Sequence, residues 1–525
     1  MLKMTDVETA LSVQNLQISL VSLAGLMILY YFVPYVKQWR LRDIPAPGVA
    51  AFSHLWLVFQ GRRGTRTMAI DKLHKTHGKM IRVAPRHISI ADDSAIQAVY
   101  GHGNGFLKAE FYDAFLNVYR SIFTSRNRVE HTRKRKAISH AFSVKSIAQV
   151  EKYAHANIEM FLKQWRSIAE NKKNPQTGFA TFDALIWFNY LSFDIVGDLA
   201  FGAPFGMLEH DRDVVEMRKD PKATPTYINA VEVLNRRGEV AATLGACPAL
   251  IPYAKWLPDP FFRLGAEAIS NLAGIATSAV NRRLSLQGTA EERTDILTRL
   301  IESKDDNGNK LGRLEITGEA LTMITGGSDT TSNTFGALLY WVLRTPRVLT
   351  NLQKVLDASI PPEVDVPTFD MVKNITYLQW VIWEALRIHS TFGLGLPREI
   401  PPDKGPVEIC GHTFHAGDIL SVPIYTVHHS PEIWGIDVED FVPERWDPER
   451  LTQRQKGSFI PFSTGPRACI GRNLAEMELF VGCATFFRLF DMRLEQKEPM
   501  KVVEGFLRKP AGLTIGIKRR EPEGR

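Results

Sequence analysis

The chain has 525 residues, of which 45% are hydrophobic, so it is long enough to bury a large core. Lysine and arginine total 64 against 57 acidic residues, and the net charge of +7 is spread along the chain. No nucleic-acid motif accompanies this charge, so we expect no nucleic-acid partner, whereas a membrane surface or an acidic protein is plausible. Four cysteines are too few for a disulfide framework.

The first element expected is a membrane-spanning helix. Residues 16–33 (LQISLVSLAGLMILYYFV) are apolar and about as long as a bilayer is thick. Lys37, Arg40 and Arg42 follow this run, so the positive-inside rule places the rest of the chain in the cytosol. A cleaved signal peptide is disfavoured, because its basic residues would precede the apolar run. Residues 1–42 are therefore predicted to form a membrane anchor with a basic flank.

The remaining residues, 43–525, are predicted to form one catalytic domain. It opens with a proline-rich link, DIPAPG at residues 43–48, which is stiff and suits a hinge next to a membrane. Short alternating patterns predict strands at residues 80–83 and 87–90 and again between 411 and 423. Most of the remaining sequence has helical character.

The longest helix is predicted from about residue 318 to 344, with Thr317 as N-cap and Pro346 just beyond its end. It is apolar nearly all round and should be buried. Its middle reads GGSDTT at residues 326–331, although buried glycines weaken a helix and buried polar groups need partners. This composition favours a functional segment over a core helix bent by serine and threonine.

A second helix is predicted over residues 376–390, with an apolar stripe at helical spacing. Glu384 and Arg387 lie three positions apart on one face and can form a pair. Alone, such a pair is a weak signal. A Pro-Glu-Arg-Trp segment containing Arg445 follows later in the chain.

One cysteine is set in an unusual context, FIPFSTGPRACIGRNLAEMELF at residues 459–480. Cys469 could be a small buried apolar residue, and no cysteine or histidine spacing nearby suggests zinc. A nucleophile would need a base close in space, which the sequence does not reveal. The remaining interpretation is a thiolate bound to a group that fixes its surroundings.

The pattern Phe462, Gly465, Arg467, Cys469 and Gly471 resembles the haem-ligand loop of the cytochrome P450 superfamily. The resemblance implies a mainly α fold with small β-sheets, preceded here by the single transmembrane helix. It implies haem b, with Cys469 as the axial ligand of iron and Arg467 paired with a haem propionate. The helix after Cys469 would direct its N-terminus at the ligand and stabilise negative charge there.

The resemblance extends to the other motifs. Asp329 and Thr330 match the oxygen-binding segment of the distal helix, where Thr330 would hydrogen-bond the dioxygen substrate and Asp329 would feed protons towards it. By the same resemblance, Glu384, Arg387 and Arg445 would form a structural lock. A last set of residues would contact the propionates: His131, where tryptophan is commoner, together with Arg135 and Arg398.

Electrons are expected from a separate protein. Only 525 − 469 = 56 residues follow Cys469, too few for a fused flavin reductase. We therefore expect NADPH to act indirectly, through an NADPH-cytochrome reductase in trans, at the endoplasmic reticulum membrane. Arg133, Lys134 and Lys136 are candidates for the docking face, although an ordinary solvated basic face is equally compatible.

Several further stretches, among them LRDIPAPG, EHTRKRKAISHAFS and EGFLRKPAGL, are similar to the fungal benzoate 4-monooxygenases. This similarity implies para-hydroxylation of benzoate to 4-hydroxybenzoate. A buried carboxylate needs a cation or several donors, which residues 111–126 could supply. The candidate substrate contacts are Tyr112, Tyr119, Arg120 and Ser125, with Thr391 and Phe392 lining the pocket from below.

Three alternatives remain open at this point. The first is a fungal secondary-metabolite hydroxylase that acts on another aromatic substrate. The second is a haem-thiolate isomerase or dehydratase; Asp329 and Thr330 argue against it, because such enzymes deliver no protons to dioxygen. The third is a non-catalytic haem sensor, which would not need the complete set of redox and proton-transfer motifs.

Overall fold

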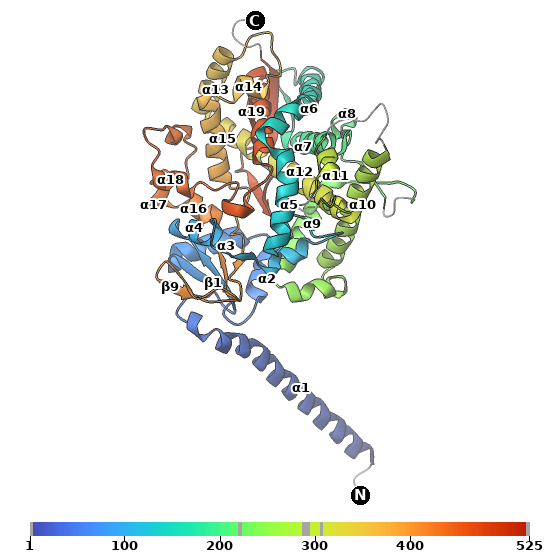
Figure 1. The fold of residues 1–525 in the computed structure, drawn as a ribbon, viewed down its shortest axis with the longest axis vertical. Helices are drawn as coiled ribbons and strands as arrows, with labels where there is room; N and C mark the ends of the chain where they lie inside the picture. Colours follow the sequence, from blue (N-terminus) through green and yellow to red (C-terminus); the bar gives the residue numbers. More distant parts are fainter. Residues whose placement is uncertain (1–3, 219–222, 286–294, 305–307, 521–525) are drawn as a thin grey trace.

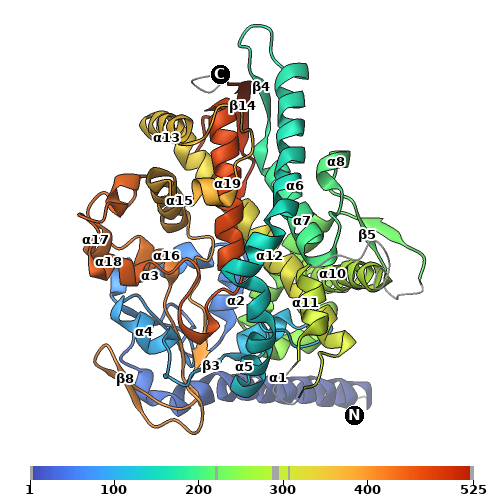
Figure 2. The same cartoon turned by 45° about the horizontal axis from the view of Figure 1, so that its top comes forward.

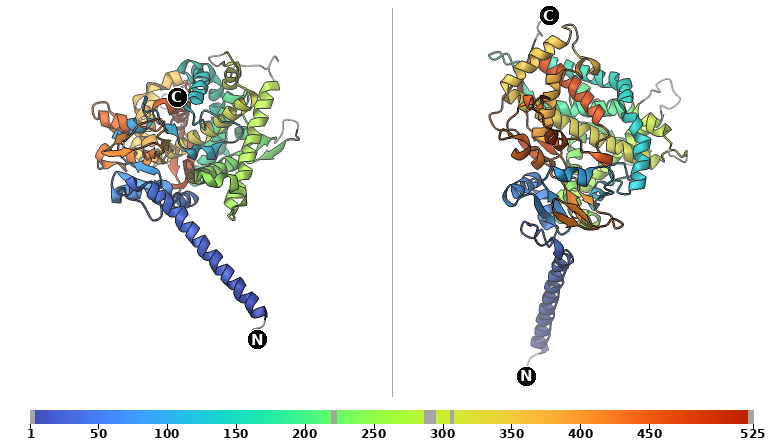
Figure 3. Two further views of the ribbon diagram at one scale, coloured as in Figure 1. Left: turned by 60° about the horizontal axis from the view of Figure 1, so that its bottom comes forward. Right: turned by 60° about the vertical axis from the view of Figure 1, so that its left-hand side comes forward.

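The computed structural model describes residues 4–218, 223–285, 295–304 and 308–520. A mainly helical body carries several small sheets, and one long helix projects from it (Figure 1). That helix, α1 (Met4–Lys37), points away from the body in every view of Figure 3. Its segment from Asn15 to Lys37 has a mean hydropathy of 1.9 and is not buried by the rest of the protein. This exposure is consistent with a membrane anchor.

The base of α1 is fixed to the body. Tyr35 stacks on Phe52 with ring centroids 4.5 Å apart. Arg40, in the short 3-10 helix η1 (Trp39–Leu41), places both guanidinium Nη atoms 2.5 Å from the carboxylate oxygens of Asp418. Arg40 therefore belongs to the joint between α1 and the body, as well as to the basic flank predicted from the sequence. A second apolar helix, α7 (Ala184–Phe201), is 83% buried and belongs to the core.

The longest helix of the body, α12 (Arg313–Arg344), runs through its centre (Figure 2). It packs against α7, α10 (Pro260–Ser285), α15 (Thr376–His389) and α19 (Arg472–Leu489). The predicted end at residue 344 is confirmed, and Pro346 begins α13 (Pro346–Ser359). The predicted start was wrong: Gly312 is the N-cap, and Thr317 lies inside the helix, where its hydroxyl donates to the Arg313 carbonyl.

The body contains further helices (Figure 1). They are α2 (Leu55–Arg62), α3 (Arg66–His77), α4 (Ser94–Tyr100), α5 (Arg128–Ser139), α6 (Val144–Asn171), α8 (Met207–His210), α9 (Ala230–Gly245), α11 (Ile296–Glu302), α14 (Phe369–Val372), α16 (Ile424–His428), α17 (Pro431–Trp434) and α18 (Gln453–Ser458). Further 3-10 helices are η2 (Glu110–Phe115), η3 (His140–Phe142), η4 (Pro248–Trp256), η5 (Pro443–Trp446) and η6 (Gly465–Arg467).

The largest sheet has the strand order β1 (Met80–Ala84), β2 (His87–Ile90), β10 (Ile419–Ser421), β7 (Arg398–Glu399) and β3 (Leu107–Lys108). The first two strands match the predicted ones. The strand expected between residues 411 and 423 is divided into β9 (His412–Phe414), which pairs with β8 (Val407–Ile409), and β10. Gly417, with φ 84°, turns the chain between them. Pairing of β3 with β7 sets Lys108 opposite Arg398.

Three smaller sheets complete the fold. Strands β11 (Phe490–Leu494), β14 (Thr514–Arg519) and β4 (Ala180–Asp183) form one, and β5 (Val215–Met217) pairs with β6 (Thr226–Ile228). The hairpin of β12 (Lys501–Glu504) and β13 (Arg508–Ala511) matters most for function. Its turn, residues 505–507, brings Phe506 and Leu507 to the wall of the central cavity.

Candidate active site

Cys469 lies on a tightly turned loop between η6 and α19. Its backbone N–H donates to the Phe462 carbonyl at 2.9 Å. Gly465 has φ +72°, and a Cβ there would lie 1.9 Å from the Tyr100 carbonyl oxygen, so only glycine fits. Gly471 is the N-cap of α19. The loop therefore holds the cysteine through backbone geometry, and Gly465 acts there without lining the cavity.

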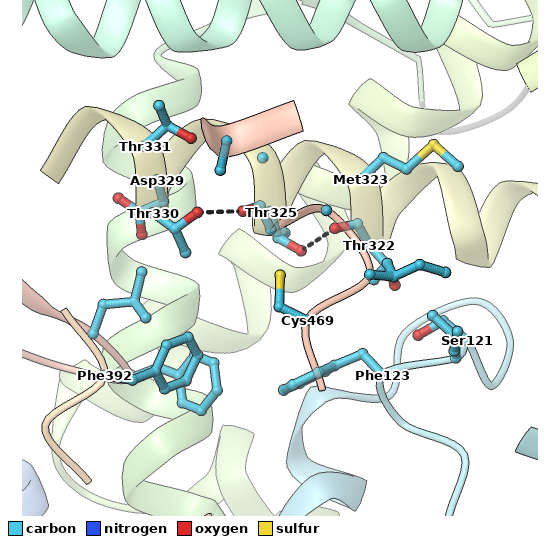
Figure 4. Close-up of a pocket in the computed structure, with 18 of the residues that line it drawn as sticks. Ser121, Phe123, Thr322, Met323, Thr325, Asp329, Thr330, Thr331, Phe392 and Cys469 are labelled. Carbon is cyan, nitrogen blue, oxygen red and sulfur yellow. Dashed lines mark hydrogen bonds between the residues drawn. The ribbon is translucent and has the colours of Figure 1, made fainter. Parts of the chain in front are cut away.

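The Cys469 thiol lies deep inside the protein but faces a cavity of about 330 Å³, so its surface is open on that side. In Figure 4 its sulfur points towards the middle of α12. Burial raises the pKa of this thiol, while the Gly471 N–H and the nearby Arg135 guanidinium act in the opposite direction. These groups and the N-terminus of α19 favour a thiolate that has a cationic partner.

A cluster of cations lies next to this loop. Arg135 donates to the Ala468 carbonyl at 2.8 Å, and Arg467 donates to the carbonyls of Ser125 and Arg126. Arg398 donates to the Tyr112 hydroxyl at 2.8 Å. Lys108 donates to the Phe123 carbonyl and sits 4.7 Å from the centres of two aromatic rings. In the described part of the chain, none of these cations is bound to a carboxylate.

The crowding of positive charge is visible in the pKa values. Burial, followed by the repulsion of Arg398, lowers the pKa of Arg467 to about 10. Burial first, then Arg467 and Lys108, lowers the pKa of His131 to about 2, so this buried ring is neutral. The pKa of Lys108 is also lowered, by burial and by the neighbouring arginines. A cluster of this kind is suited to bind an anion with more than one carboxylate.

Helix α12 passes over the thiol, and its two glycines have different surroundings. A Cβ on Gly326 would meet nothing within 4 Å, because this residue faces the cavity. A Cβ on Gly327 would lie 2.6 Å from Val196 Cγ2, so this glycine allows α7 to pack closely. The helix is continuous through both residues. The Thr330 hydroxyl donates to the Gly326 carbonyl at 2.6 Å and lines the cavity (Figure 4).

Asp329 also reaches the cavity wall and has two partners. Its Oδ2 lies 2.5 Å from Lys509 Nζ, and its Oδ1 accepts from Asn333 Nδ2 at 3.3 Å. Lys509 comes from β13 and also donates to Asn235 Oδ1 on α9. The acid and the alcohol predicted from the sequence, Asp329 and Thr330, thus lie next to each other on α12 and line the same cavity as Cys469.

The predicted lock is assembled behind the loop. The buried Glu384 accepts from Arg387 Nε and Nη2 and from Arg445 Nε, at 2.8 to 2.9 Å. Trp446 Nε1 donates to the same carboxylate at 3.0 Å. Arg387 also donates to the carbonyls of His428 and Asp440. Three segments, at residues 384–387, 428 and 440–446, are therefore held together around one buried acid.

The structure divides the predicted substrate contacts into two sets. Tyr119, Thr391 and Phe392 line the cavity. Tyr112, Arg120 and Ser125 are not among its lining residues. Instead the Tyr112 hydroxyl accepts from Arg398, Arg120 pairs with Asp113 at 2.8 Å, and Ser125 donates to Glu130. Asp113 and Glu130 thus occupy Arg120 and Ser125, while Arg398 occupies Tyr112, and the sequence pattern did not indicate these pairings.

The proposed docking cations also have structural partners. Lys134 is fully buried and is bound to Glu315 and Glu319. Arg133 pairs with the same Glu315. Lys134 was therefore wrongly predicted as a surface residue, because α5 turns this position towards α12. In contrast, sequence reasoning missed Lys108, Phe115, Phe123 and Arg237, all of which line the cavity.

Comparison with known proteins agrees with this site. The sequence model of the family Cytochrome P450 matches residues 45–517. This chain belongs to the cytochrome P450 family. It is 64% identical over 499 residues, 95% of this chain and 96% of the relative, to Benzoate 4-monooxygenase bphA of Aspergillus niger. More distant relatives include Cytochrome P450 monooxygenase traB of Penicillium crustosum, which is 28% identical over 87% of each chain.

The cavity of this cytochrome P450 fits the haem that its family implies. The Cys469 thiol faces the cavity from one side, and Gly326 on α12 leaves open space on the other side. The cations Arg135, Arg398 and Arg467 lack a carboxylate partner in the described part of the chain, as two propionates would require. His131 adds a neutral buried ring beside them. Phe462 lines the same wall.

Proposed function

We propose that this cytochrome P450 hydroxylates benzoate at its para carbon and releases 4-hydroxybenzoate. One oxygen atom of dioxygen enters the ring and the other leaves as water, with two electrons from NADPH and two protons balancing the reaction. The observation that carries the proposal is the 64% identity, over 95% of the chain, with relatives named benzoate 4-monooxygenase. The cavity supports it, since a small aromatic acid matches a space lined by phenylalanines and cations.

In the proposed mechanism Cys469 would hold haem b, which would supply oxygen activation when bound. Arg135, Arg398 and Arg467 would bind its propionates and so hold the group in the cavity. His131, neutral because of its burial, packs beside these cations without adding charge. The chain thereby positions the reaction centre between the Cys469 loop and α12.

The acid–alcohol pair on α12 handles protons. Thr330 holds its hydroxyl at the cavity wall through its bond to the Gly326 carbonyl, so this group can exchange partners without leaving the wall. Asp329 lies one residue away and is tethered by Lys509 and Asn333. We assign Asp329 the delivery of protons from the protein interior and Thr330 their transfer at the dioxygen substrate.

The same proposal includes a location and an electron donor. Helix α1 serves as a single-pass anchor in the endoplasmic reticulum membrane, with the catalytic body in the cytosol. A separate NADPH-cytochrome reductase supplies the electrons. The rigid joint at Arg40 and Asp418 would hold the body at a fixed orientation to the membrane. Proteolysis of intact microsomes, which should remove the body and spare α1, tests the topology.

The experiment that tests the activity is a titration of the purified, haem-loaded ferric protein with benzoate, followed in the Soret band. A saturable shift from low to high spin supports the proposal, and turnover with reductase and NADPH should then yield 4-hydroxybenzoate. If benzoate produces no shift and a larger aromatic compound does, the protein hydroxylates another substrate. A shift without oxygen consumption would contradict a monooxygenase.

A further inference from the structure

Among the described residues, five lysines and arginines line the cavity: Lys108, Arg135, Arg237, Arg467 and Lys509. Four of them belong to groups of side chains that are already described. Lys108, Arg135 and Arg467 belong to the cation cluster beside Cys469, and Lys509 is paired with Asp329. Arg237 is the fifth, and its hydrogen bond goes to the Phe115 carbonyl instead of to either group.

Arg237 comes from α9 and is only 7% exposed. Its Nη2 donates to the Phe115 carbonyl at 2.9 Å, while its buried Nε has no hydrogen-bond partner. Burial alone lowers the pKa of this guanidinium, to about 10, so it stays charged at neutral pH. In the described part of the chain it has no acidic partner. A buried cation without a counter-charge is costly, and a bound anion would offset that cost.

The neighbouring arginine shows that this arrangement is specific. Arg236 has a more exposed side chain and pairs with Glu239 Oε2 at 2.9 Å. The nearest acid on α9 is therefore already bound to the surface arginine, one turn along the helix. The two adjacent arginines have opposite environments, and the one that lines the cavity has no acidic partner among the described residues.

An aromatic wall connects Arg237 with the rest of the cavity. The guanidinium lies 5.5 Å from the centre of the Phe115 ring. The Phe115 and Phe506 rings are 4.5 Å apart, and Phe506 meets Phe392 edge to face at 4.8 Å. In Figure 4 Phe392 lies below Thr330 and beside Cys469, and all three residues line the cavity. A flat ring between these phenylalanines would have a cation at one end and the acid–alcohol pair of α12 at the other.

We propose that Arg237 binds the carboxylate of the aromatic acid substrate and makes the enzyme selective for anionic rings. This inference rests on the proposed function. A guanidinium offers two parallel N–H groups to a carboxylate, and the free Nε is one half of such a fork. A ring held by its carboxylate at Arg237 directs its para carbon away from the guanidinium, which explains oxidation at that position.

The test compares Arg237→Met with the matched control Arg236→Met. Both variants are titrated with benzoate and with nitrobenzene, a neutral molecule of nearly the same shape. For Arg237→Met we expect the Kd of benzoate to rise about 30-fold or more, because a buried charge pair is lost. The Kd of nitrobenzene should change less than about 3-fold. Arg236→Met should leave both values near those of the unmodified protein.

Three results would overturn the inference. Unchanged benzoate affinity in Arg237→Met would exclude the contact, and an equal loss for both ligands would indicate a packing role. A selective loss of benzoate in Lys108→Met, with Arg237→Met unaffected, would move the contact to Lys108. The Soret band of the reduced carbon monoxide complex checks that each variant keeps its thiolate site. If the unmodified protein itself does not bind benzoate, the proposed function fails, whichever residue is changed.

Discussion

Lys509 Nζ lies 2.5 Å from Asp329 Oδ2 and joins the C-terminal hairpin to the middle of α12. Both side chains are largely buried, and Lys509 is also bound to Asn235 on α9. The hairpin turn carries Phe506 and Leu507 into the cavity. Lys509 therefore connects the hairpin that lines the cavity with Asp329, the acid that we assign to proton delivery.

Replacing Lys509 by methionine should leave the Asp329 carboxylate buried without its counter-charge. We expect the free energy of unfolding to fall by about 2–4 kcal/mol, less than for a fully enclosed pair. Urea unfolding followed by tryptophan fluorescence measures this loss. Product formed per NADPH consumed should also decrease, because the carboxylate is no longer held in place. The Kd of benzoate should stay within about 3-fold.

A double-mutant cycle isolates the pair. In Lys509→Met with Asp329→Asn both charges are gone, so this double variant should be more stable than the sum of the single losses predicts, by about 1–3 kcal/mol. Additive losses would show that the two groups do not interact in solution.

The sequence predicted Asp329 but not Lys509, for a physical reason. The motif around Asp329 is local, with its residues adjacent along the chain. Lys509 meets it only because the β12–β13 hairpin folds over α12 and α9. Arg237 escaped prediction for the same reason, since only the packing of η2 against α9 decides which of two adjacent arginines is buried. Lys134 was misplaced because a lysine beside other basic residues usually faces solvent.

Removing one arginine from the lock around Glu384 should strongly lower the stability of the folded protein. In Arg445→Leu the buried Glu384 keeps Arg387 but loses its bond to Arg445 Nε, and the carbonyls of Trp434 and Asp437 lose their donors. We expect a destabilisation of about 3–5 kcal/mol and poor haem retention. The exposed Arg450, five positions later, is the control, and Arg450→Leu should change stability by less than about 0.5 kcal/mol. Equal effects would contradict a lock.

Gly465 and Gly457 form a matched pair of glycines near the Cys469 loop. An alanine at position 465 would need φ +72° and would place its Cβ 1.9 Å from the Tyr100 carbonyl oxygen. Because backbone must move to relieve this clash, we expect a loss of about 3 kcal/mol or more and a weak thiolate Soret band. Gly457 lies inside α18 with nothing within 4 Å of its Cβ position, so Gly457→Ala should be neutral or stabilising by up to about 1 kcal/mol. A normal spectrum for Gly465→Ala would refute the steric argument.

Buried His428 should make stability depend on pH. Its Nδ1 donates to Ser390 Oγ at 2.8 Å, and its Nε2 accepts from the Ile460 N–H at 3.2 Å, in the segment that leads into η6 and the Cys469 loop. Burial, with a smaller contribution from Arg387, lowers the pKa of this ring from 6.5 to about 3. The folded state thus binds fewer protons than the unfolded state between these values.

Because the unfolded state binds more protons, the free energy of unfolding falls as the pH is lowered. The contribution of His428 is fully present above about pH 6.5 and is lost as pH falls towards 3, by about 1.4 kcal/mol per unit within that window. His428→Gln can still accept from Ile460 but does not titrate, so its free energy of unfolding should fall less steeply between pH 6.5 and 4.5. The exposed His102 is the control, and His102→Gln should keep the slope of the unmodified protein. Parallel slopes for all three proteins would mean that His428 does not stay neutral in the folded state.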